Sequence, residues 1–273
     1  MIPLGPGPVP RTSSELDERL AAGLGRMLTA AHARPVTVES RVGADAAVEH
    51  VRIDVTGVDV SAARDIDPGA VTSSVAAIVG ALSVVGSPAV VRGLPVQLTA
   101  EAQNVPVTWN ESADGSLWLS VEDSADAARP ASARVDASTG VEDIERFVSK
   151  ELGARLGGMG LALKGLSVVV QAVGARGLDL RSDATVGKSF LSAKVTVTAR
   201  ATVDDALTLT ISNVDLTSGN PIVSALVSRA DAMLAPWNGR RIDLTRYSFA
   251  GARLRDVGVS ADDRIRVHAA FGA

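Results

Sequence analysis

The chain of 273 residues contains no cysteine and few aromatic residues, namely four Phe, three Trp and one Tyr. The absence of cysteine excludes disulfide bonds, thiolate metal sites and cysteine nucleophiles. Because aromatic rings are scarce, any core is built mainly from Val, Leu, Ile and Ala. A basic excess is also missing, since 27 Lys and Arg stand against 31 Asp and Glu. Nucleic-acid-binding proteins normally carry such an excess, so we expect no nucleic-acid partner.

Long hydrophobic runs are missing too. The most apolar stretch, residues 71–91, is interrupted by Ser, Gly and Pro, and no run reaches the roughly 18 apolar residues of a membrane-spanning helix. Residues 1–11 are rich in Pro and Gly and lack the cationic and apolar regions of a secretory signal peptide. We therefore expect a flexible or polyproline-like tail over residues 1–11 and a cytoplasmic protein, unless a signal has been removed.

Four segments carry the pattern of an amphipathic helix. A capping box at residues 12–15 (TSSE) precedes apolar residues at three- and four-residue spacing, and a second one at residues 139–142 (TGVE) does the same. Asp67-Pro68 and Asn220-Pro221 each supply an N-cap residue followed by Pro, which is favoured at the first helical position. The apolar spacing after each Pro predicts helices that end near residues 86 and 235.

The segments between these helices alternate apolar and polar residues, as strands do, and short turns join them, which favours antiparallel meanders. The order of helix, strands, Pro-opened helix and strands occurs twice. We therefore predict an α+β fold of two similar halves, each a long amphipathic helix pair with a curled antiparallel meander. The expected boundaries are 12–121 for the first half, 122–139 for a linker and 140–273 for the second half.

This repeated helix-plus-meander unit, together with the closing segments LRDVGVS (254–260) and RIRV (264–267), resembles the tubular lipid-binding (TULIP) superfamily, in particular its bacterial members. The resemblance is one of architecture and covers residues 12–272. No invariant catalytic motif defines that family. The resemblance implies an elongated apolar seam between helices and a curved sheet, and a lipid as the ligand.

Motifs for catalysis are absent or incomplete. The Gly-x-Ser-x-Gly pentapeptide of many serine hydrolases does not occur. Residues 186–189 (VGKS) end like a phosphate-binding loop, but Ser182 stands where the first Gly is needed and the following segment alternates like a strand. The three histidines lie in separate segments without ligand clusters, at His32, His50 and His268. We expect no enzyme activity, no cofactor and no metal.

Two weaker features have ordinary structural explanations. Asp59 and Asp215 occupy matching places in the two halves, yet both precede turns, where Asp commonly bonds nearby backbone. Residues 240–266 hold seven Arg against four Asp. This excess could meet an anionic membrane surface, giving peripheral membrane contact, while the alternative is a solvated outer strand face.

The apolar faces of the Pro-opened helices carry the functional prediction. Most of these residues pack in a core, but part of each face could remain open and accept an acyl chain. The sequence thus predicts non-enzymatic binding, or transfer, of a lipid or other hydrophobic ligand. The alternative is a structural or protein-interaction module with a closed core. The predicted groove is lined by Val75, Ile78, Leu82, Leu226, Met233 and Leu234.

Overall fold

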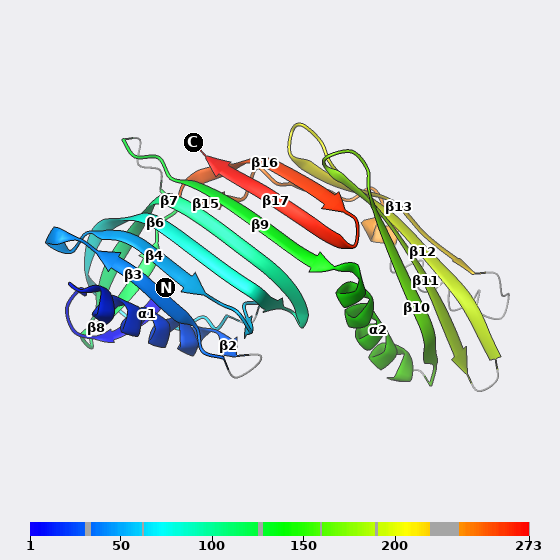
Figure 1. Ribbon diagram of the computed structural model, residues 1–273, viewed down its shortest axis with the longest axis horizontal. Helices are drawn as coiled ribbons and strands as arrows, with labels where there is room; N and C mark the ends of the chain where they lie inside the picture. The colour runs from blue at the N-terminus through cyan, green and yellow to red at the C-terminus, as the bar shows by residue number, and fades with distance from the viewer. Residues whose placement is uncertain are drawn as a thin grey trace. The chain divides into compact units, whose positions relative to one another are not determined.

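The computed structural model describes residues 1–30, 34–61, 63–124, 128–158, 160–188, 191–218 and 235–272. The described chain is mostly β-strand, with α1 (Ser13–Met27) and α2 (Val141–Gly158) as its two α-helices (Figure 1). It divides into two units. The first contains Met1–Ala137, Arg246–Asp256 and His268–Ala273, and the second contains Ser138–Thr245 and Val257–Val267.

The strands of the first unit belong to one mixed sheet, whose main path has the order β15-β16-β17-β9-β7-β6-β4-β3. Most neighbours are antiparallel, but β4 pairs with β6 in parallel. The chain needs the segment 55–70 for this crossover, because parallel neighbours cannot be joined by a tight turn. The strands are β1 (Ile2–Pro6), β2 (Thr29–Ala30), β3 (Thr37–Val42), β4 (Val48–Asp54), β5 (Val58–Asp59), β6 (Val71–Val91), β7 (Leu94–Ser112), β8 (Ser116–Val121) and β15 (Ser248–Phe249). The unit boundary crosses β9 (Ser132–Gly140), β16 (Ala252–Ala261) and β17 (Arg264–Gly272).

Helix α1 closes the core of the first unit. As the capping box predicts, Thr12 is the N-cap and its side chain accepts a hydrogen bond from the Glu15 amide. Leu16 and Leu20, one helical turn apart, are 1% and 2% exposed and pack against the buried sheet residues. The core they join is almost entirely aliphatic, as the composition implies, with Trp109 as the one aromatic ring among its buried members.

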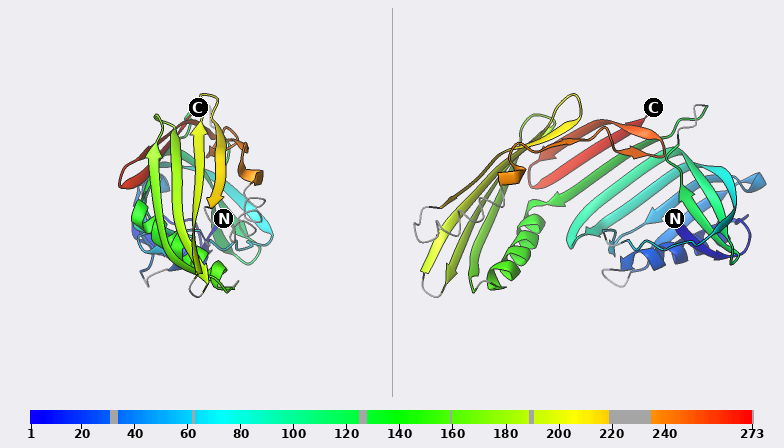
Figure 2. Two further views of the ribbon diagram at one scale, coloured as in Figure 1. Left: turned by 90° about the vertical axis from the view of Figure 1, so that its right-hand side faces the viewer. Right: turned by 180° about the vertical axis from the view of Figure 1, so that it is seen from behind.

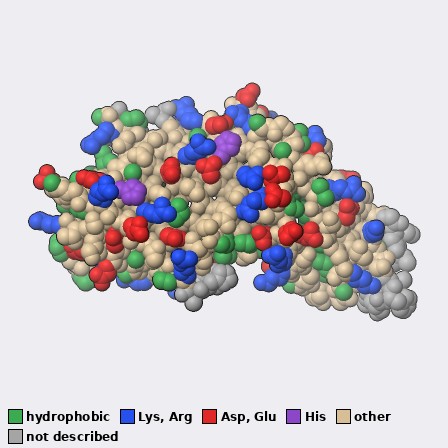
Figure 3. Space-filling view, viewed as in Figure 1, with side chains coloured by type: hydrophobic (Ala, Val, Ile, Leu, Met, Phe, Trp, Pro, Cys, Tyr) green, Lys and Arg blue, Asp and Glu red, His purple; other side chains and the backbone are tan. Residues whose placement is uncertain are grey.

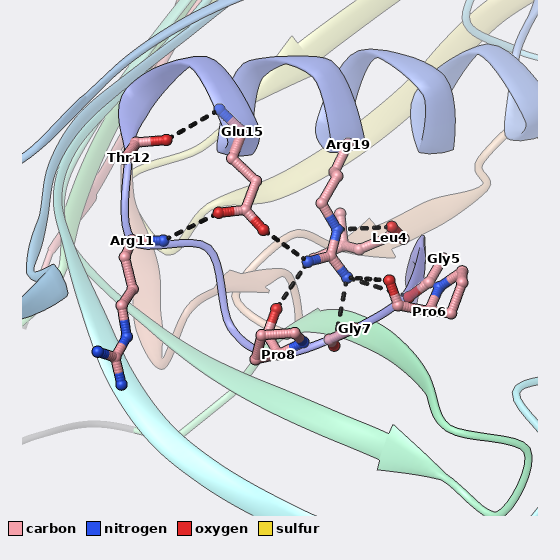
Figure 4. Close-up of polar contacts among 9 residues, drawn as sticks. All are labelled: Leu4, Gly5, Pro6, Gly7, Pro8, Arg11, Thr12, Glu15 and Arg19. Atoms are coloured by element: carbon pink, nitrogen blue, oxygen red, sulfur yellow. Dashed lines mark hydrogen bonds and ion pairs between the residues drawn. The ribbon is translucent and has the colours of Figure 1, made fainter.

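The Pro/Gly-rich N-terminus is not the flexible tail that its composition predicts. β1 pairs antiparallel with β8, and Arg19 of α1 binds the segment that follows (Figure 4). Its guanidinium donates to five successive backbone carbonyls, those of Leu4 (2.8 Å), Gly5 (3.0 Å), Pro6 (3.3 Å), Gly7 (3.5 Å) and Pro8 (2.6 Å). Gly5 and Gly7 have φ values of 78° and 113°, a region that glycine enters without steric cost. These two residues therefore let the chain curl around the charge.

The close approach of β1 to α1 makes a prediction for two glycines of the same helix. A Cβ built on Gly23 would overlap the carbonyl oxygen of Pro3, whereas one on Gly25 would meet nothing within 4 Å. We expect Gly23→Ala to lower the free energy of unfolding by about 1–3 kcal/mol, as overpacked substitutions do. Gly25→Ala should raise it by up to about 1 kcal/mol through helix propensity. Urea denaturation of both variants measures the difference, and equal effects would contradict the observed contact.

The helix predicted to begin at Asp67-Pro68 is wrong, because residues 71–91 form β6. The Asp67 carboxylate accepts the amide of Gly69 (2.9 Å) and so closes a local turn in place of a helix cap. Residues 71, 75, 78, 79, 82 and 85 do have helical spacing, but β6 is rich in Val and pairs with β7 along nearly its whole length. The 21-residue strand satisfies its backbone in that ladder, and β-branched residues favour strands.

The second unit holds a separate sheet of five antiparallel strands in chain order, β10 (Ala162–Ala172), β11 (Gly177–Lys188), β12 (Leu191–Val203), β13 (Thr208–Ser218) and β14 (Arg241–Asp243). Strands β10 to β13 run side by side in Figures 1 and 2. The helix predicted behind the second capping box is confirmed as α2, and it packs against the edge strand β10.

The predicted fold class of two long amphipathic helix pairs is therefore wrong. Each unit contributes one α-helix to the described residues, and large sheets dominate both. The predicted fourth helix lies mostly outside the described residues. β9 occupies residues 132–140, which overlap the expected linker at 122–139. The strands predicted at residues 166–173, 190–203 and 206–216 agree with β10, β12 and β13, whereas β11 has no counterpart among the predicted strands.

Candidate functional site

The described half of the predicted groove lies on β6, and its residues do not share one face. Val75 is 57% exposed and pairs with Trp109 of β7. Its side chain lies on the same face of the sheet as that of the buried Val79. Ile78 is three positions further along the strand and points to the opposite face, because side chains alternate. Leu82 is half-buried against the core of the first unit. The other three predicted residues, Leu226, Met233 and Leu234, lie outside the described residues.

The interior of the first unit is filled by its own side chains. Its largest fully buried residues include Leu16, Leu20, Val58 and Val105, each less than 2% exposed. They belong to one continuous cluster, all of whose members come from the first unit. A ligand on this side would have to displace packed aliphatic groups. The first unit therefore supports the closed-core alternative for its own part of the chain.

The five-stranded sheet of the second unit has a different character. Alternation along β10 to β13 places mainly aliphatic side chains on one face, interrupted by Ser182 and Ser218, and mainly polar ones on the other. Most residues of this apolar face are only half-buried, and none belongs to the large buried cluster. The apolar face consists of Leu166, Val168, Val170, Leu178, Leu180, Ala184, Val186, Ala193, Val195, Val197, Ala199, Ala201, Val203, Leu209, Ile211, Leu216 and Ile242.

The composition of the apolar face bears on how it could be covered. It holds no aromatic ring, although rings are the side chains that fill wide gaps most efficiently. α2 lies along β10, and Val168 and Val170 of that strand are 7% exposed each. Of the residues of β12 and β13 on this face, Ala193 is 6% exposed and the others stay half-buried. The face is therefore an apolar surface that is partly shielded at its β10 edge.

The opposite face of the same sheet is polar and its charges are compensated. Arg200 donates to both carboxylate oxygens of Asp179 at 2.5 and 2.6 Å, and this lowers the pKa of Asp179. Hydrogen bonds from Arg181 and Thr196 lower the pKa of Asp183 in the same way. A hollow of about 320 Å³ lies among these residues. Because each of these two arginines is paired with a carboxylate, the hollow offers no net charge to a ligand.

A second hollow, of about 490 Å³, separates α2 from the start of β10. Ser149 and Gly153 line it from the helix, and residues 161–166 line it from the strand. We call this space the α2/β10 slot. It lies beside Leu166, where the apolar face begins. Nothing in the periodicity of either segment indicates the slot, because it results from small residues on two elements meeting in space.

The remaining sequence candidates behave as structural residues where the structure describes them. Asp59 accepts hydrogen bonds from the amide and hydroxyl of Ser61, which confirms its role in a turn and lowers its pKa. His268 lies 3.7 Å from Asp256 on the surface. Within the described residues, no three His, Asp or Glu side chains are grouped so that they could hold a metal ion. Nor does any described helix combine the length and apolarity needed to cross a membrane.

The alternation that creates the apolar face was visible in the sequence. It predicts β10, β12 and β13 but not β11, and the predicted ligand site lies on helix faces instead. What the pattern could not show is that most of that face is only half-buried among the residues that the structure describes. Comparison of the chain with models of known families, with curated proteins and with solved structures finds no match.

Proposed function

We propose that this protein binds a lipid or another hydrophobic ligand on the apolar face of the second unit, without covalent chemistry. The observation that carries the proposal is the contrast between the two units. The first unit buries its aliphatic residues in a closed cluster, whereas the second presents a mainly aliphatic face across five strands that stays largely half-buried. Apolar surface of this extent on one face commonly marks a ligand or partner site.

The energetics of such a face suit an alkyl chain. Shielding each CH₂ group from water contributes about 0.8 kcal/mol, so ten carbons supply about 8 kcal/mol before the costs of association. No specific polar contact is needed for that contribution. The aliphatic side chains that line these strands also let an extended alkyl chain lie along them.

The surface charge is compatible with a soluble carrier of neutral or charged ligands. Basic and acidic side chains are interspersed over the face shown in Figure 3, in keeping with the net charge of −4. This mixed pattern does not favour a highly basic or acidic macromolecular partner. Peripheral membrane contact during loading or release of a lipid remains part of the proposal.

The test is native mass spectrometry of the protein purified from its own host, followed by solvent extraction. We expect adducts of several hundred daltons, which the extraction identifies as lipid. A fluorescent fatty acid added to the delipidated protein should then bind saturably. A bare 28.0 kDa mass together with no uptake of the probe would contradict the proposal and favour the protein-interaction module.

A further inference from the structure

The α2/β10 slot is closed at both ends and open between them. At one end the amide of Leu161 donates to the carbonyl of Leu156 at 2.9 Å, where the helix turns into the strand. At the other end the amide of Val168 donates to the carboxylate of Glu145 at 3.4 Å. Figures 1 and 2 show α2 beside β10 over this length.

The slot is open because small residues follow Glu145 along the helix. Glu145, Ser149 and Gly153 are spaced by four, so they lie on one side of α2. Glu145 reaches the strand, whereas Ser149 and Gly153 line the hollow. A Cβ built on Gly153, or on Gly165 of β10, would meet nothing within 4 Å. The slot therefore has room for an added side chain at Gly153 on its helix wall and at Gly165 on its strand wall.

The strand side of the slot presents backbone donors. β10 is an edge strand, and the bond from Val168 to Glu145 shows that this amide points away from β11. Amide directions alternate along an antiparallel strand, and Leu166 and Val168 are two positions apart in unbroken register. The amide of Leu166 therefore points into the slot. A carboxylate already occupies the equivalent position at Val168, so this edge accommodates an anion.

The charge of the slot agrees with this. Lys164 lines it and sits at the register shift of β10, beside Leu166. Lys150 and Arg155 are exposed on the same stretch of α2, with Glu151 as the acidic residue between them. With the Glu145 carboxylate at the end of the slot included, these five side chains carry one net positive charge, and Lys164 is the one that lines the slot. The side chain of Leu166 meanwhile belongs to the apolar face, so the slot adjoins that face at its edge.

We propose that the α2/β10 slot holds the anionic head group of an amphiphile, a carboxylate or a phosphate, while the alkyl chain extends onto the apolar face. Lys164 and the Leu166 amide bind the oxygens of the head group, because hydrogen bonds to a charged acceptor are stronger than those between neutral groups. This inference rests on the proposed function, since it assigns the head group of the same ligand.

The experiment compares dodecanoate, dodecanol and inorganic phosphate as probes of the delipidated full chain at pH 7.5. Binding is measured by calorimetry and by displacement of a fluorescent fatty acid. We expect dodecanoate to bind at least about tenfold more tightly than dodecanol. Lys164→Gln should reduce this ratio to about threefold or less and leave dodecanol unchanged. In spectra of ¹⁵N-labelled protein, the Leu166 amide should shift with dodecanoate and not with dodecanol.

A matched pair of variants tests the slot itself. Gly153→Leu fills the slot, while Gly157→Leu adds the same side chain to the same helix in open space outside it. We expect Gly153→Leu to lower the affinity for dodecanoate at least about tenfold. Gly157→Leu should leave that affinity within about twofold of wild type. Circular dichroism checks that both variants keep the helix.

The outcomes separate this inference from the proposed function. Equal affinity of wild type for dodecanoate and dodecanol, or equal effects of the two glycine variants, would overturn the head-group site while the apolar face still binds its ligand. If inorganic phosphate binds as tightly as dodecanoate, the slot is a site for free anions, and the proposal that it holds the head group of an amphiphile is overturned. If neither alkyl probe binds, the proposed function and the inference fail together.

Discussion

Val197→Asp is expected to weaken uptake of a fluorescent fatty acid on the order of 100-fold, because it places a carboxylate in the middle of the apolar face. Val197 lies on the central strand β12, between Ser182 of β11 and Leu216 of β13. A bound alkyl chain would cover the new charge and remove its water, which costs several kcal/mol for an unpaired ion. The variant protein meets this cost only when the ligand binds.

The matched control is Thr198→Asp, the next residue of the same strand. Its side chain lies on the polar face, so it adds the same charge to the same strand without touching the apolar face. We expect its affinity for the fatty acid to stay within about threefold of wild type. Circular dichroism and thermal melting confirm that both variants fold. Equal losses in the two variants, or full uptake by Val197→Asp, would place the ligand elsewhere.

Arg19→Ala is expected to lower the free energy of unfolding by about 3 kcal/mol, the upper end for hydrogen bonds to a charged group. The Arg19 side chain is 13% exposed and serves five carbonyls of the N-terminal segment. Its removal leaves the part-buried carbonyls of Leu4 and Gly5 without this donor. β1 should then detach from β8, since Arg19 binds the residues that complete and follow that strand.

Urea denaturation followed by tryptophan fluorescence measures this effect. Trp118 is 7% exposed and pairs with Pro3 of β1, so loss of β1 should also shift its emission to longer wavelength under native conditions. Arg19→Lys should recover only part of the stability, because an ammonium group cannot span the carbonyls that the planar guanidinium reaches. Arg11→Ala is the control, since Arg11 contacts Glu15 through its backbone amide. A similar loss in Arg11→Ala would refute the role of the Arg19 contacts.

The N-terminus is ordered although its composition predicts a tail. Five residues of Pro, Gly and small apolar type resemble a tail, because they have no periodicity and few side-chain hydrogen bonds. Their order comes from Arg19, which is 11 to 15 positions away in the chain. No local pattern predicts a partner at that distance. The same holds for Gly23, whose lack of a side chain admits the carbonyl of Pro3.

β6 is the second case in which a local pattern failed. Its apolar residues satisfy a helical period, and Asp67-Pro68 has the form of a helix start. Helix and strand were both compatible with the sequence, although Val and other β-branched residues favour the strand. Pairing with β7 on one side and β4 on the other decided the outcome, because it satisfies the backbone of 21 residues at once. This error moved the predicted groove onto a strand whose neighbours are already packed.

What the sequence determined by itself was local: the capped helix α1, the helix α2, and the alternating strands β10, β12 and β13. Capping and alternation act between residues a few positions apart, so they can be read along the chain. Tertiary structure alone decided which aliphatic faces are closed. α1 seals the first unit, whereas α2 leaves the apolar face of the second half-buried and a slot beside β10. Burial depends on contacts between distant segments, and for that reason the candidate site emerged only from the fold.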